Sequence, residues 1–167
     1  MRIVDGVADI DDLDAFLARL DEVAAEHGVT VQAFDARYIV DRNHLERAVE
    51  LADRAIARGE NVARERGVEI LLYAAGRRQI DDALTMGVRE GRTPTAVVVS
   101  DAAGDEAAEA AAAADVAALL DPATTLDDAD GERVRAFFDV TETELDATDG
   151  GLADLVAERV ALLDVEK

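Results

Sequence analysis

Arginine is concentrated in one part of an otherwise strongly acidic chain. Residues 54–92 contain eight arginines and six acidic residues, which gives a local net charge of +2. The remaining residues carry a net charge of −23, and the whole chain of 167 residues carries −21. A segment held near neutrality inside so acidic a protein indicates a site for an anionic partner.

Two of these arginines, Arg77 and Arg78, follow Gly76 at the junction between two predicted helices. Side chains at such a junction can project clear of the packed helix faces. A neighbouring helix N-terminus would add to the attraction for anions. Salt-bridged surface arginines and an anion-binding site are equally compatible with this pattern.

The residue types that carry out catalysis are sparse. The chain has no cysteine and two histidines, and it lacks a phosphate-binding glycine loop and a serine in a nucleophile elbow. We interpret His27 as a cap at a helix end and His44 as a packed or capping residue. Tyr73 is expected in the core, and Glu69 is expected to bond a neighbouring helix end. The sequence therefore predicts no catalytic, cofactor or metal site.

Three helices must position the arginines. The first starts at the predicted N-cap Asn43, with Glu46 completing a capping box, and stops at Gly59. Asn61 is predicted to cap the second, which ends at Gly76, and a short third helix ends at Gly87. Helical spacing predicts that their buried faces carry Leu45, Val49, Ala52 and Ile56, then Val68, Leu71, Leu72 and Ala75, then Ile80, Ala83 and Leu84.

The flanking segments predict an α+β fold. Strands are expected over residues 2–7 and 29–33, and a strand buried on both faces over 95–100. Helices are expected over 10–27, capped by Asp11, over 102–120, and along the amphipathic stretch 152–163. An acidic loop is predicted over 122–131, and 132–139 is either a short helix or a final strand. Thr141 and Glu144 form a capping box. We expect a single domain over 1–167, with several helices around a small sheet of about four strands, mixed or antiparallel.

The charge also predicts the setting in which the protein works. The acidic residues number 38 against 17 basic ones, yet half of the chain is hydrophobic, which argues against disorder. We interpret the excess as adaptation to molar salt, where charge repulsion is screened, in an extreme halophile of the haloarchaeal type. With no apolar run long enough to span a membrane and no signal peptide at residue 1, we expect a cytoplasmic protein.

The ordered spacing of many residues between 35 and 87 resembles the accessory subunit of the KEOPS (EKC) complex, of the Cgi/TPRKB family of kinase-binding proteins. The matching residues are Asp35-Ala36, His44-Leu45, Ala48, Ala52, Ala55, Asn61, Glu69, Leu71-Leu72-Tyr73-Ala74, Gly76, Arg78-Gln79-Ile80, Ala83 and Gly87. Thr95 to Val99 is similar to the strand that follows in that family. Phe137-Phe138-Asp139-Val140-Thr141 with Glu144-Leu145 is similar to its C-terminal signature.

The resemblance implies a non-catalytic regulatory subunit. Members bind and stimulate a small kinase-like ATPase, which in turn binds the transferase that installs threonylcarbamoyladenosine in tRNA. In archaea they also help to recruit tRNA by its 3′ CCA end. Charge and the family pattern together place the expected tRNA site at Asn61, Arg64, Arg77, Arg78 and Gln79. The kinase is expected to dock on an exposed apolar patch of a helix.

Two other functions remain open on the sequence alone. One is a small nucleotide- or acyl-binding α/β enzyme that uses the loop after the 97–99 strand. The other is a self-associating structural protein whose central helices form a homodimer.

Overall fold

A four-stranded antiparallel sheet organises the molecule. The computed structural model describes residues 1–127 and 129–166. Strand β3 (Gly91–Ser100) pairs along its length with β1 (Arg2–Ile10), and on its other side with β2 (Thr30–Asp35). The short β4 (Asp121–Pro122) pairs with the outer edge of β1, so the order is β2-β3-β1-β4. Of the two sheet types expected, the antiparallel one is present.

The inner strand β3 is buried on both faces, as its run of β-branched residues predicts. Val97 and Val99 belong to one apolar cluster, while Ala96 and Val98 belong to another. Successive side chains of a strand point to opposite faces, so a separate core lies on each side of the sheet.

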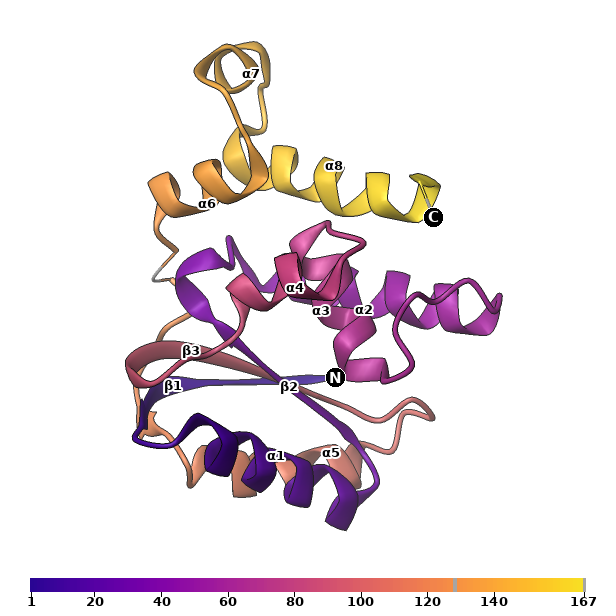
Figure 1. Cartoon of the computed structure of the whole chain (residues 1–167), viewed down its shortest axis with the longest axis vertical. Coiled ribbons are helices and arrows are strands. Elements are labelled where there is room, and N and C mark those ends of the chain that lie inside the picture. Colours follow the sequence, from indigo (N-terminus) through magenta and orange to yellow (C-terminus); the bar gives the residue numbers. More distant parts are fainter. Residues whose placement is uncertain (128, 167) are drawn as a thin grey trace.

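Helices α1 (Leu13–His27) and α5 (Glu106–Ala117) cover one face of the sheet (Figure 1). Leu20 and Val23 of α1 and Val116 of α5 are buried in the core on that side. The predicted cap of α1 was off by one residue. Asp12, not Asp11, accepts a hydrogen bond from the backbone N–H of Ala15.

The other face carries α2 (Arg42–Ala57) and α3 (Arg66–Ala75). These two helices lie between the sheet and a further layer made by α6 (Gly131–Phe138) and α8 (Gly151–Glu166) (Figure 1). Every residue of α3 from Glu69 to Ala75 is buried, because neighbours surround the helix. The cap predictions for both helices were wrong. Asp41 caps α2 in place of Asn43, and Glu65 rather than Asn61 precedes α3.

The C-terminal part adds three helices. They are α6 (Gly131–Phe138), α7 (Glu142–Ala147) and α8 (Gly151–Glu166). The alternative of a helix over 132–139 is confirmed, as is the capping box of Thr141 and Glu144. The acidic loop predicted over 122–131 includes Asp128, and the expected domain includes Lys167; both residues lie outside the described ones.

After α3 the chain forms α4 (Ile80–Ala83) and a 3₁₀ turn (Leu84–Met86). Ala83 is buried, but Ile80 and Leu84 are 42% and 54% exposed, so the prediction that they face inward was wrong. A helix of one turn has too little surface to bury a full apolar stripe. Ile56, at the end of α2, is also exposed rather than buried.

Candidate functional site

The loop between α2 and α3 is held in place by a buried carboxylate. Glu69 is fully buried, and its Oε1 accepts hydrogen bonds of 3.0 Å from the backbone N–H groups of both Val62 and Ala63. The side chain of Asn61 donates to the carbonyl of Ala63 at 2.9 Å. The structural role predicted for Glu69 is confirmed, but its partners lie in the α2–α3 loop and not at a helix end. These bonds also explain why α3 starts only at Arg66.

The junction between α3 and α4 forms the second part of the site. Gly76 ends α3 with a φ of 61°, a left-handed conformation that glycine adopts most easily. The backbone N–H groups of Gly76 and Arg77 close the helix on the carbonyls of Tyr73 and Leu72. The chain then turns outward, so that Arg78 and Gln79 are exposed.

A shallow pocket joins these two segments. It is lined by Val62 from the α2–α3 loop and by Arg78, Gln79, Ile80 and Asp81. Val62 is 47% exposed, which adds a second exposed apolar side chain to that of Ile80. The pocket therefore combines two apolar surfaces, a guanidinium, an amide and one carboxylate. We call it the Arg78 pocket.

The structure separates the five residues predicted to bind tRNA. Arg78 and Gln79 lie in the Arg78 pocket, while Asn61 and Arg64 belong to the loop that contributes Val62. Arg77 does not line this pocket. Its guanidinium carbon lies 4.7 Å from the centre of the Phe137 ring, and Nη2 donates to the Phe137 carbonyl, so it connects α3 to α6.

Sequence reasoning missed the apolar part of the pocket. Val62 was not singled out, and Ile80 was assigned to the core. The available signal was the position of Ile80 directly after two arginines and a glutamine, at the first turn of a helix too short to be covered.

Most of the eight arginines within residues 54–92 already have a partner. Those with an ion pair or a carbonyl partner are Arg54, Arg66, Arg77, Arg89 and Arg92. The other three have no side-chain partner within the part of the chain that the structure describes: Arg58, Arg64 and Arg78. Their positive charge is therefore available to a ligand.

The remaining residues considered for chemistry have structural roles. His44 is buried, its Nδ1 accepts from the Val40 N–H, and its Nε2 lies 2.8 Å from the Ala74 carbonyl. Burial lowers the pKa of His44, against the opposing effects of the Ala74 carbonyl and Asp41. Tyr73 is also in the core, where burial first and its hydrogen bond to Asp164 second raise its pKa.

The loop after β3, which the enzyme alternative would use, is closed by a side chain. Glu109 of α5 is buried, and its Oε2 accepts from the backbone N–H of Asp101 at 2.8 Å. A phosphate at that turn would have to compete with a carboxylate for the same donor. The arrangement therefore gives no support to an anion-binding enzyme site at this loop.

Taken together, the fold and the Arg78 pocket define a small α+β protein with an exposed surface that is both cationic and apolar. The family model of kinase binding protein CGI-121 matches residues 7–164, and the chain belongs to this family. No curated protein matches the chain. None of the described helices combines the length and the apolar character that crossing a membrane requires.

Proposed function

We propose that this chain is the non-catalytic accessory subunit of the KEOPS complex, which makes threonylcarbamoyladenosine in tRNA. In this role it binds and stimulates the small kinase-like ATPase, and through that subunit it associates with the tRNA threonylcarbamoyl transferase. It also helps to recruit tRNA by the 3′ CCA end. Membership of the CGI-121 family supports the kinase partner, and the Arg78 pocket supports the RNA partner.

The observation that carries the RNA proposal is the Arg78 guanidinium, which has no partner among the described residues and lies beside exposed apolar side chains. Single-stranded RNA is held by cationic contacts to phosphate and by stacking of its bases on planar or apolar surfaces. Arg78 supplies the charge, and the faces of Val62 and Ile80 supply surface for a base. The Gln79 amide has both donors and an acceptor for a base edge.

Binding of labelled tRNA to the variant Arg64→Glu/Arg78→Glu tests this proposal. Each lost charge-assisted contact is worth a factor of about ten, so the dissociation constant should rise at least about tenfold. The measurement is fluorescence anisotropy at a fixed high KCl concentration. A tRNA that lacks its CCA end serves as the second ligand and should bind the wild type about as weakly as intact tRNA binds the variant.

Arg19→Glu is the matched control. Arg19 is exposed on α1, beyond the sheet from the Arg78 pocket, and the substitution changes the charge by the same amount per residue. Equal loss in the control would show a general charge effect instead of a site. Unchanged affinity in the Arg64/Arg78 variant would remove this pocket from tRNA binding.

The kinase requires a different surface, and α8 offers one. Leu162 and Val165, three residues apart on one face of the helix, are 47% and 80% exposed. Exposed large apolar side chains that share a face are typical of protein docking surfaces. We assign the kinase to this pair because the Arg78 pocket, with its unpaired arginine, fits the RNA better.

Kinase binding of the variant Leu162→Asp/Val165→Asp distinguishes the two surfaces. Affinity for the ATPase, measured by calorimetry, should fall at least about tenfold, while tRNA binding stays at the wild-type level. Leu17→Asp is the control, since Leu17 is a similarly exposed leucine on α1. If the kinase binds Leu162→Asp/Val165→Asp normally but fails to bind a variant with Ile80→Asp, the assignment of the two partners is reversed.

A further inference from the structure

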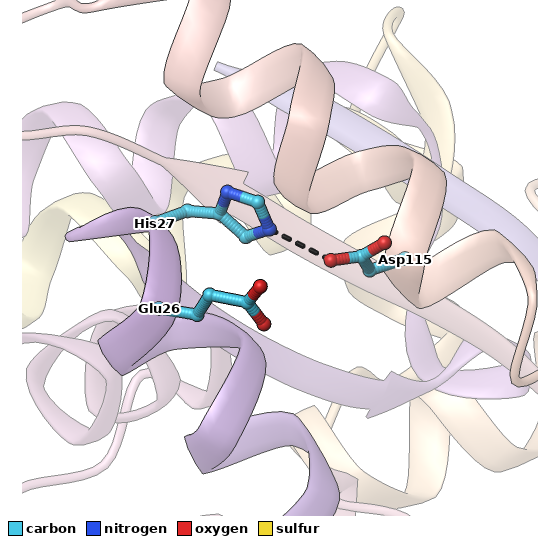
Figure 2. A group of neighbouring side chains, drawn as sticks. All are labelled: Glu26, His27 and Asp115. Carbon is cyan, nitrogen blue, oxygen red and sulfur yellow. Dashed lines mark hydrogen bonds and ion pairs between the residues drawn. The ribbon is translucent and has the colours of Figure 1, made fainter.

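Helices α1 and α5 lie side by side on the face of the sheet opposite α2 and α3 (Figure 1). At the end of α1, Nε2 of His27 lies 2.7 Å from Oδ2 of Asp115, which belongs to α5. The carboxylate of Glu26 points into the same space between the helices (Figure 2). One ligand atom from each of the three residues lies within 4.8 Å of the others.

This arrangement leaves negative charge without compensation. Within residues 1–127 and 129–166, Asp115 has His27 as its only partner, and Glu26 has no ion pair or hydrogen bond. With a neutral imidazole the three groups carry a net charge of −2, and like charges so close together repel each other. A divalent cation would cancel this charge and take the place of the proton on Nε2.

We propose that Glu26, His27 and Asp115 bind a divalent first-row transition-metal ion, with zinc as the best fit, and that this ion joins α1 to α5. One imidazole nitrogen and two carboxylate oxygens form a ligand set that zinc accepts, with water completing a tetrahedron. Calcium and magnesium prefer oxygen ligands alone, so the imidazole selects against them. The potassium of a salt-rich cytoplasm is excluded for the same reason.

The ion would act on the stability of the outer helical layer. His27 and Asp115 are 88 residues apart in the chain, so their ligand atoms converge only in the folded protein. A metal ion that binds only the folded state stabilises it in proportion to its binding. This inference is independent of the proposed partners, because the cluster belongs to α1 and α5, which lie on the other side of the sheet from α4 (Figure 1).

Zinc titration of the metal-stripped chain in molar KCl tests the proposal. Calorimetry should show one saturable zinc site per chain. Thermal unfolding with free zinc at about a hundred times its dissociation constant should show a Tm higher by roughly 5–10 °C. X-ray absorption of the zinc-loaded chain should show nitrogen and oxygen ligands at about 2.0–2.2 Å.

Substitutions at the cluster decide whether the site is specific. His27→Gln keeps a hydrogen-bond donor for Asp115 but loses the coordinating nitrogen, and it should abolish both the saturable binding and the Tm rise. Asp115→Asn should behave in the same way. Asp21→Asn changes the charge by as much as Asp115→Asn does, at an exposed position on α1. It should leave the zinc binding and the Tm rise at the wild-type level.

Two results would overturn the proposal. If zinc binds His27→Gln as it binds the wild type, the ion is held by scattered surface carboxylates. If zinc leaves the Tm of the wild type unchanged, the pair of His27 and Asp115 is an ordinary hydrogen bond between two helices. Circular dichroism of each variant shows whether a loss of binding reflects a loss of folding.

Discussion

Single side chains decide which parts of this protein are fixed and which are open to a ligand. Glu69 of α3 and His44 of α2 are both buried, with their polar atoms bonded to backbone groups. Arg78, in the same part of the chain, points outward without a partner among the described residues. The buried pair therefore supports the loop and helix that present Arg78.

His44 makes stability depend on pH in a defined direction. Its pKa is lowered in the folded protein from the usual 6.5, so the unfolded chain takes up a proton at higher pH than the folded one. Stability should therefore fall as pH drops below about 6.5, with a slope of up to about 1.4 kcal/mol per pH unit until the lowered pKa is reached. The free energy of unfolding at pH values between about 7 and 5 measures this slope.

His44→Gln isolates the contribution of the imidazole. The variant is less stable near neutrality because it loses the contacts of the two imidazole nitrogens with the Val40 N–H and the Ala74 carbonyl. The difference in free energy of unfolding between the wild type and the variant should shrink as the pH falls. Only the wild type has to release a proton from this position when it folds. All other titrating groups are common to both proteins and cancel. A deficit that stays constant with pH would show that His44 does not contribute to the acid sensitivity.

At the scale of elements, the contact between the end of α3 and α8 positions the Arg78 pocket. Gly76 lies against α8, so that a Cβ added there would come 3.2 Å from the carbonyl oxygen of Arg159. Arg159 in turn donates to the carbonyl of Phe138 and pairs with Glu144. Helix α8 therefore contacts the turn that leads into Arg78 and also binds α6 and α7.

The pair Gly76→Ala and Gly28→Ala measures this contact. Both glycines have a left-handed φ, 61° and 66°, but a Cβ at Gly28 would meet nothing within 4 Å. Gly28→Ala should lower the free energy of unfolding by about 1 kcal/mol, the cost of the conformation alone. Gly76→Ala should lower it by about 2–3 kcal/mol, because α8 must shift as well.

Thermal unfolding of the two variants provides the comparison, at roughly 2–4 °C per kcal/mol for a chain of this size. Equal effects at the two glycines would mean that α8 yields to a methyl group without cost. In that case the turn before Arg78 is not fixed by α8.

The limits of prediction from sequence are clearest at these elements. The sequence encodes three kinds of feature locally, and they were predicted correctly: the buried run of β3, the ends of α1 at His27 and of α3 at Gly76, and the capping box at Thr141. The exact caps were not, because the predicted and the observed residues, Asp11 and Asp12 or Asn43 and Asp41, are about equally favoured at the start of a helix.

The sequence predicted exposed side chains at the α3–α4 junction, but not which of the two arginines there would be exposed. The concentration of arginine indicated the α3–α4 junction, and Arg78 and Gln79 are exposed there. Arg77 is adjacent in sequence, yet it turns to Phe137, which is 60 residues away. Such a choice depends on tertiary packing, and the local sequence does not record it. The exposure of Ile80 depends in the same way on the lack of a covering element.

At the scale of the whole molecule, we expect the net charge of −21 to make the stability of the fold depend on salt. Most of the ion pairs involve exposed side chains, such as those of Arg19 with Glu22 and Arg42 with Glu46, and exposed pairs contribute little. Repulsion between the many unpaired carboxylates is therefore reduced mainly by dissolved salt. This is the physical basis for the proposed halophilic origin.

A shift from molar KCl to dilute buffer should destabilise the protein. Two unit charges about 10 Å apart in water repel by about 0.4 kcal/mol, which a Debye length of ~3 Å almost removes and one of ~10 Å reduces only to about a third. Over dozens of carboxylate pairs the difference amounts to several kcal/mol, so the Tm should fall by roughly 10 °C or more between ~1 M and ~0.1 M KCl. Scanning calorimetry over a KCl series measures the fall.

Sucrose is the control, because it is excluded from protein surfaces but does not screen charge. If sucrose in dilute buffer restored the Tm as fully as KCl does, screening would not be the cause, and the acidic surface would need an explanation other than adaptation to salt.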